Sequence, residues 1–100
     1  MKHPLCGLSI VIPSMGRRSC VIDCINDLAA LEDEPLEVLV IEQAKLPSPL
    51  PKPNQFNVRQ FFCHPPNASL ARNIGLAEAS GDIVLFLDDD VRISNPNFLE

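Results

Sequence analysis

Residues 83–90 read IVLFLDDD, so the most apolar stretch of the chain ends in three consecutive carboxylates. Charged side chains are rarely left in such a position unless they are paired or bind a cation. Asp88 and Asp90 form a D-x-D pair, which suits a hard divalent cation that also carries substrate phosphates. The stretch therefore predicts a buried strand whose end presents a metal-assisted site for a phosphate-bearing ligand.

Around this stretch the chain alternates between apolar runs and segments with helical spacing. We expect four strands and two helices, the strands over residues 8–12, 36–41, 56–62 and 83–87 and the helices over residues 19–31 and 69–79. Ser19 is expected to cap the first helix, and Gly81 to end the second. The second helix should bury Leu70, Ile74 and Ala77. Prolines at every second position from 47 to 53 predict an extended surface loop between the second and third strands.

The apolar runs indicate an α/β fold. Near-continuous runs at the first, second and fourth predicted strands are typical of a mostly parallel sheet with both faces covered by helices. The third run is less apolar and belongs nearer an edge. We therefore expect a Rossmann-like domain with a sheet of about four strands.

In such sheets ligands bind beyond the carboxyl ends of the strands, where the strand order reverses. The polar groups at residues 14–17, 42–43 and 88–90 follow the first, second and fourth predicted strands. All three groups should therefore meet at that edge, which is where a nucleotide would bind.

Composition and charge argue against several other classes of protein. The 100 residues, 46% apolar and 21% charged, are typical of one globular domain with a single core. The net charge is −5 and no basic run exceeds Arg17-Arg18, so a nucleic-acid-binding surface is not expected. No apolar stretch approaches the roughly 18 residues of a membrane span, and no signal-peptide core is present. We expect a soluble, cytoplasmic protein.

The four cysteines allow a zinc site or disulfides to be considered. They contain no C-x-x-C pair, and Cys63-His64 stands alone. Buried reduced thiols that pack as small apolar side chains are the favoured interpretation of Cys6, Cys20, Cys24 and Cys63.

Three segments in order resemble the GT-A glycosyltransferases of family 2. They are residues 10–13 (IVIP), 71–76 (ARNIGL) and 79–90 (ASGDIVLFLDDD), and the spacing from Ala-Arg-Asn-x-Gly through Gly-Asp to the D-x-D carries the resemblance. It implies that residues 1–100 form the N-terminal, donor-binding half of such an enzyme. The donor would be a nucleoside-diphosphate sugar, with UDP favoured. The acceptor would be a hydroxyl of a sugar, a lipid or a polysaccharide.

The resemblance also implies which residues hold the base, the ribose and the phosphates. Pro13, Ser14 and Met15 would line the base and the ribose. Glu42, after the second strand, would contact the base. Arg72 would lie near the base and the phosphates, with a helix-surface cation as its alternative.

For the acidic run, the resemblance implies that Asp88 touches the ribose. Asp90, together with Asp88, would bind Mn²⁺ or Mg²⁺ bridging the diphosphate, and the metal would neutralise the charge of the departing nucleoside diphosphate. Asp89 belongs to the donor-binding group, either facing solvent or supporting a neighbouring group. Arg17 and Arg18 could reach phosphates, but a solvated helix start is the favoured interpretation.

Residues 95–100 look like a helix start, with Asn95 as cap and Pro96 at the first helical position. Family members continue with an acceptor-binding half that carries the general base, and no candidate for that base is evident here. We therefore expect a domain truncated at its C-terminus. The alternative function is a catalytically incomplete nucleotide-binding or self-associating interaction module. Two helices hardly cover a four-stranded sheet, so we expect a homo-oligomer.

Overall fold

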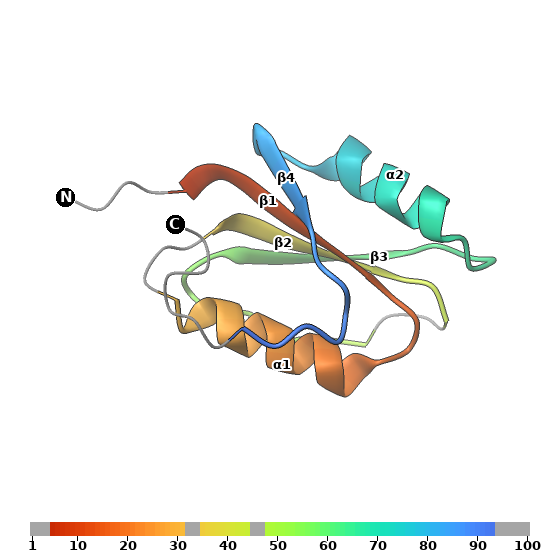
Figure 1. Ribbon diagram of the computed structural model, residues 1–100, viewed down its shortest axis with the longest axis horizontal. Helices are drawn as coiled ribbons and strands as arrows, with labels where there is room; N and C mark the ends of the chain where they lie inside the picture. The colour runs from red at the N-terminus through yellow and green to blue at the C-terminus, as the bar shows by residue number, and fades with distance from the viewer. Residues whose placement is uncertain (1–4, 32–34, 45–47, 94–100) are drawn as a thin grey trace.

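The computed structural model describes residues 5–31, 35–44 and 48–93 (Figure 1). Along this part of the chain, strands and helices alternate as the sequence predicts. The elements are β1 (Leu5–Ser14), α1 (Arg18–Ala29), β2 (Pro35–Glu42), β3 (Asn57–Phe62), α2 (Ala68–Glu78) and β4 (Ile83–Phe86). The helix predicted from Asn95 lies outside the described residues.

The four strands form one parallel sheet in the order β3-β2-β1-β4. The chain moves from β1 outward to β2 and β3, and α2 then carries it back across the sheet to β4 on the other side of β1. The strand order therefore reverses between β1 and β4, where open α/β sheets bind their ligands. The expected Rossmann-like α/β fold is confirmed, as is the edge position of β3.

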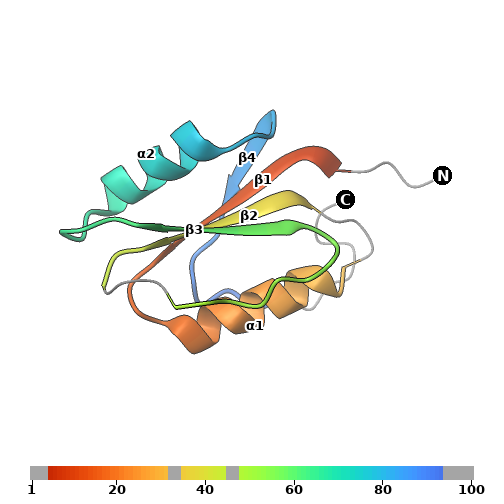
Figure 2. The same ribbon diagram turned by 180° about the vertical axis from the view of Figure 1, so that it is seen from behind.

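One helix covers each face of the sheet (Figures 1 and 2). Side chains of a strand alternate between the two faces, so β1 and β2 each contribute to both cores. The α1 side contains Ile10, Ile12, Val38 and Val40 against the helix residues Val21, Cys24, Ile25 and Leu28. The α2 side is smaller and consists of Val11, Leu39, Ile41, Cys63 and Ala71. Both faces of β1 and β2 are buried, as their apolar runs predict.

The expected cap of the first helix is wrong. Arg17 occupies the N-cap position without a side-chain cap, and Ser19 lies inside the first turn. Gly16 adopts a positive φ of 79°, which turns the chain into the helix earlier than the position of Ser19 suggests.

The second helix packs through a different face from the one predicted. Its buried residues are Ala71 and Gly75, whereas Leu70 is 46% exposed and Ala77 is also exposed; of the predicted residues only Ile74 is partly buried. A Cβ at residue 75 would lie 2.4 Å from Val11 Cγ1, so the small face lets the helix approach β1 closely.

The helix ends at Glu78, one residue before the predicted end, but the predicted role of Gly81 is wrong, because Ala79 is the C-cap. Gly81 instead lies against the backbone of Gly7, where a Cβ would be 2.3 Å from the Gly7 carbonyl oxygen. Strand β4 likewise departs from a fully buried strand, since Ile83 is 64% exposed.

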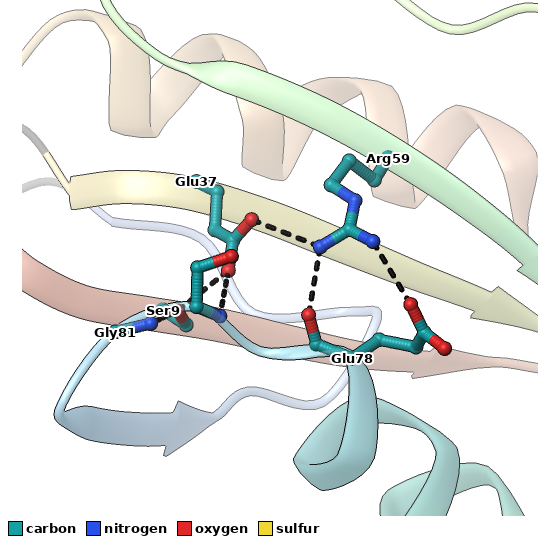
Figure 3. A network of polar contacts seen from close by, with 6 residues as sticks. Ser9, Glu37, Arg59, Glu78 and Gly81 are labelled. Carbon is teal, nitrogen blue, oxygen red and sulfur yellow. Dashed lines mark hydrogen bonds and ion pairs between the residues drawn. The ribbon is translucent and has the colours of Figure 1, made fainter.

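A buried polar cluster, Ser9–Glu37–Arg59, fastens the turn after α2 to the middle of the sheet (Figure 3). Glu37 is 3% exposed; its Oε2 accepts hydrogen bonds from Ser9 Oγ at 2.8 Å and from the Ser80 N–H at 2.7 Å. Its Oε1 accepts one from Arg59 Nη1 at 3.2 Å. Burial raises the pKa of Glu37, but these three hydrogen bonds outweigh burial and hold the pKa below its usual value.

The same cluster reaches the end of α2. Arg59 also donates to the Glu78 carbonyl oxygen at 2.7 Å and to Glu78 Oε1 at 3.0 Å. The Gly81 N–H donates to Ser9 Oγ at 2.9 Å (Figure 3). This chain of contacts therefore joins β1, β2 and β3 to one another, to the last residue of α2 and to the connection between α2 and β4.

The proline-containing segment 48–53 has no regular structure, as predicted; Pro47 lies outside the described residues. Figure 2 shows this loop running along α1 before the chain enters β3. Arg18 Nη2 donates to the Pro49 carbonyl oxygen, and Gln55 Nε2 donates to the Ala29 carbonyl oxygen at 3.2 Å. The loop is therefore held at both ends of the helix.

The cysteines whose side chains are described are free thiols. Cys24 and Cys63 are buried in the two cores, where they pack as apolar side chains. Burial, and then the nearby Asp27 carboxylate, raise the pKa of Cys24 to about 11. Neither helix in the described residues is both long enough and apolar enough to cross a membrane. The predicted cytoplasmic location stays a prediction.

Candidate functional site

A cleft of about 320 Å³ lies at the carboxyl edge of the sheet. The ends of β1, β2 and β4 and the first turns of α2 line it. The lining residues are Pro13, Met15, Arg17, Gln43, Ala68, Arg72, Asp88, Asp89 and Asp90. The cleft is therefore located where the reversal of strand order predicts a ligand site.

The acidic run extends β4 into this cleft. The Leu87 N–H donates to the Val11 carbonyl oxygen at 3.0 Å, so pairing with β1 continues up to the first carboxylate. Beyond that point the burial alternates: Asp88 and Asp90 are exposed, whereas Asp89 is only 7% exposed. The two members of the D-x-D pair are thus the ones available to a ligand.

The segment after the carboxylates is anchored on α1. Arg92 Nε donates to Asp27 Oδ2 at 2.8 Å, and Arg92 Nη2 donates to Asp27 Oδ1 at 3.1 Å. The Ile93 N–H adds a bond to Asp27 Oδ2 at 2.9 Å, and these bonds, that of Arg92 first, lower the pKa of Asp27. The acidic run is therefore fixed on both sides, by β1 before it and by α1 after it (Figure 1).

Asp89 and Arg17 join the acidic run to the turn between β1 and α1. Asp89 Oδ2 accepts the Met15 N–H at 3.3 Å, and Arg17 Nη1 lies 3.4 Å from Asp89 Oδ1 and 3.3 Å from Asp90 Oδ2. The alternative in which Asp89 faces solvent is wrong, because this carboxylate is buried and supports the turn. Arg17 is the N-cap residue of α1 and its side chain is 57% exposed, which agrees with the favoured solvated helix start, but it also pairs with the carboxylates of Asp89 and Asp90.

The sequence placed Arg17 at this edge, within residues 14–17, but did not predict its pairing with the carboxylates. Arg17 follows β1 and the carboxylates follow β4, so the adjacency of these two parallel strands brings them together. Arg18 contacts the proline loop rather than the carboxylates.

Glu42 holds the turn rather than lining the cleft. It is buried, and its Oε2 accepts the N–H groups of Gly16 at 2.9 Å, Gln43 at 3.1 Å and Ala44 at 2.9 Å. This single oxygen ties the end of β2 to the turn that follows β1. The predicted contact of Glu42 with a base stays a prediction.

Gln43, which the sequence placed at this edge within residues 42–43 but to which it gave no role, also lines the cleft. Its Oε1 accepts the Asn67 N–H at 3.1 Å, and its Nε2 donates to the Ser14 carbonyl oxygen at 3.4 Å. Asn67 in turn caps α2, since its side-chain oxygen accepts the Leu70 N–H at 2.9 Å. Gln43 thereby links the ends of β1 and β2 to the start of the helix that carries Arg72.

The predicted base and ribose residues lie on two sides of β1. Pro13 and Met15 line the cleft, whereas Ser14 is buried and does not line it. Neighbouring side chains of a strand point to opposite faces, which explains the difference. Within the described part of the chain, Ser14 Oγ has no hydrogen-bond partner. Arg72 is exposed and lines the cleft from α2. Its predicted position near the base and the phosphates stays a prediction.

The residues of the cleft are compatible with a divalent cation that shares its ligands with a phosphate group. Among residues 5–31, 35–44 and 48–93, no cluster of three or more His, Cys, Asp or Glu side chains is arranged to hold a metal ion. Mg²⁺, however, is usually bound by one or two carboxylates together with water and substrate phosphates. Asp88 and Asp90 supply two such carboxylates.

The comparisons with known proteins agree with this geometry. The family model described as glycosyl transferase family 2 matches residues 9–100. The crystal structure of S. aureus TarS 1-349 aligns with a TM-score of 0.72 and 24% identity, covering 87% of this chain and 28% of that chain. A second crystal structure of S. aureus TarS aligns with a TM-score of 0.63 and 23% identity, covering 83% of this chain and 16% of that chain. No curated protein matches the chain.

At these identities the likeness to TarS shows the fold alone. The chain spans less than a third of either solved structure, 28% and 16%.

Proposed function

Since this chain belongs to glycosyltransferase family 2, we propose that its cleft binds a nucleoside-diphosphate sugar together with Mn²⁺ or Mg²⁺. The bound sugar would be transferred to a hydroxyl of a sugar, a lipid or a polysaccharide. UDP is the favoured nucleotide of the donor.

The charge of the cleft carries this proposal. Arg17 and Arg72 contribute two positive charges to its lining, and Asp88, Asp89 and Asp90 contribute three negative charges. A diphosphate is itself an anion, so it would be repelled by a cleft with this net negative charge. A divalent cation on the exposed carboxylates reverses the sign and lets the phosphates bind.

In the proposed mechanism, Asp90 and Asp88 hold the cation, and Asp88 also contacts the ribose. The cation, when bound, neutralises the charge that develops on the departing nucleoside diphosphate. Arg72 reaches the phosphates from α2. Asp89 acts by holding the turn after β1, through its bond with the Met15 N–H.

The base and the ribose would lie against the end of β1. Pro13 and Met15 provide an apolar surface in the cleft, on which a flat base can stack. Ser14 and Glu42 act from behind this surface: Ser14 is buried in the strand, and Glu42 fixes the turn through the Gly16 N–H.

Calorimetric titration of UDP, and then of GDP, with and without Mn²⁺ tests the proposal. We expect UDP to bind only in the presence of Mn²⁺, and Asp90→Asn to weaken this binding by more than about tenfold. Asp82→Asn is the matched control, because Asp82 precedes β4 and lies at the opposite end of the strand from the cleft. Absence of binding by either nucleotide, or equal effects of the two substitutions, would contradict the proposal.

A second candidate function, self-association as an interaction module, is favoured by the outer edge of β4. No strand within the described residues pairs with this edge, and Ile83 is exposed. Unpaired apolar edges promote association between copies. We expect dimers or larger species in sedimentation at micromolar concentration, reduced by Ile83→Glu but not by Leu76→Glu on α2. A monodisperse monomer of the unaltered chain would contradict this function.

A further inference from the structure

We propose that Arg17 is an exchangeable counter-ion of the cleft. It neutralises Asp90 before a divalent cation binds, and the cation displaces it, which frees its guanidinium for the diphosphate of the donor. The inference rests on the proposed function and adds a residue and a sequence of events to it.

The contacts of Arg17 are those of a pair that can be broken. A single nitrogen, Nη1, is shared between Asp89 Oδ1 at 3.4 Å and Asp90 Oδ2 at 3.3 Å. Charge-assisted hydrogen bonds are typically about 2.7–2.9 Å long and often bidentate. The Arg17 side chain is also 57% exposed, so solvent screens the attraction and the exchange costs little.

The backbone around Arg17 is fixed, in contrast to its guanidinium. The Met15 N–H is held by Asp89 and the Gly16 N–H by Glu42, while Arg17 is the N-cap residue of α1 and its carbonyl oxygen accepts the Val21 N–H at 3.0 Å. When Asp90 is taken by a cation, the side chain can therefore swing away but its Cα stays at the rim of the cleft. The guanidinium remains within reach of any group bound there.

The exchange follows from electrostatics. A divalent cation and a guanidinium repel each other, so they do not share Asp90 Oδ2 at hydrogen-bond distance. A diphosphate bound to the cation offers the displaced guanidinium a better partner, because phosphate oxygens accept bidentate bonds from arginine. Arg17 should therefore weaken metal binding, because it competes with the cation for Asp90, and strengthen nucleotide binding, because it donates to the diphosphate.

Titrations of Mn²⁺ alone, and of UDP at saturating Mn²⁺, separate these two effects. For Arg17→Gln we expect Mn²⁺ to bind up to about fivefold more tightly, the change that loss of an exposed ion pair allows. UDP should bind about tenfold more weakly, since a hydrogen bond to a charged group is lost. Arg18→Gln removes the same charge one residue away, where the side chain contacts Pro49, and should change neither affinity more than about twofold.

A measurement on the unaltered chain guards against a folding defect in the variant. During titration with diamagnetic Mg²⁺, the Nε–H signal of Arg17 in a nitrogen NMR spectrum should shift as the site fills. The signal of Arg18 should not move.

Three results would overturn the inference. If Arg17→Gln binds Mn²⁺ no more tightly than the unaltered chain does, Arg17 does not compete with the cation. The proposed function would still stand in that case, provided that the unaltered chain binds UDP. An Arg17 signal that does not respond to Mg²⁺ has the same meaning. Failure of both the unaltered chain and the variant to bind Mn²⁺ or UDP removes the proposed function as well.

Discussion

Two clusters of arginine and carboxylate groups in this molecule have opposite characters. The cluster around Glu37 and Arg59 is centred on a carboxylate that is 3% exposed, and the two oxygens of this carboxylate accept three hydrogen bonds of 2.7–3.2 Å. The cluster around Arg17 lies at the strand ends, where one guanidinium nitrogen is divided between two carboxylates and Asp88 and Asp90 are exposed. The first cluster is saturated and can only hold the fold together. The second is unsaturated and can accept a ligand.

Helix α2 connects the cluster around Glu37 and Arg59 to the cleft that holds the other cluster. Its first turns carry Ala68 and Arg72 in the cleft, and its last residue, Glu78, is bound by Arg59. The position of the cleft wall therefore depends on the buried cluster at the other end of the helix. Changes in the buried cluster should appear as lost stability, and changes in the cleft as lost binding.

The largest effect is expected from Glu37→Ala. Removing a buried carboxylate leaves the Ser80 N–H and Ser9 Oγ without their acceptor and Arg59 without one of its partners. We expect the free energy of unfolding in urea to fall by about 3 kcal/mol. Glu78→Gln is the control, because this exposed side chain should cost less than about 1 kcal/mol. Similar losses for the two variants would mean that the buried cluster does not stabilise the fold.

Gly75→Ala should have the next largest effect, because it moves the helix that forms one wall of the cleft and is bound at its end by Arg59. The new Cβ would lie 2.4 Å from Val11 Cγ1 and push α2 away from β1. Overpacking of this kind costs about 1–3 kcal/mol, more than the higher helix propensity of alanine returns. At Gly7 a Cβ meets Asp82 Oδ2 at an ordinary 3.6 Å, so Gly7→Ala is the matched control. Urea unfolding and UDP titration of both variants would check the expectation, and a stabilised Gly75→Ala would contradict it.

The two clusters also differ in how far the sequence predicts them. Residues 83–90 identify the exposed carboxylates, since a charged run directly after an apolar strand is rarely left without a counter-ion. Glu37 also stands within an apolar run, but its partners come from three other segments of the chain and become visible only in the folded sheet. The contact of Arg17 with Asp89 joins residues 72 positions apart, so it too becomes visible only in the folded sheet.

Local patterns predicted the four strands and their parallel arrangement, because burial on both faces demands continuous apolar runs. They failed for the buried face of α2. The apolar positions Leu70 and Ala77 have helical spacing, yet the closest approach is made by the small residues Ala71 and Gly75. Hydrophobic periodicity gives the larger apolar side chains more weight than the small ones. It therefore cannot detect a helix that packs closely on a sheet through alanine and glycine.

The smallest effect is expected when the pH is lowered. It is the change in the difference in unfolding free energy between the unaltered chain and Glu37→Gln, in which residue 37 carries no charge. The pKa of Glu37 is lowered in the folded chain, so its contribution to stability is present above its ordinary value of 4.5 and is lost as the pH falls through the folded value. In Glu37→Gln this contribution is absent at every pH. The difference in unfolding free energy between the two proteins should therefore be largest near neutral pH and shrink on acidification below about pH 4.5.

The other lowered carboxyl pKa in the described residues, that of Asp27, is common to both proteins. Its acid dependence cancels in the difference, because Asp27 contacts Arg92 and not Glu37. Urea unfolding from pH 7 down to about pH 3 measures the difference directly. A difference that stays constant over this range would mean that Glu37 titrates alike in the folded and unfolded chains. In that case the hydrogen bonds around Glu37 would not favour its charged form, and the buried cluster would owe its effect to packing alone.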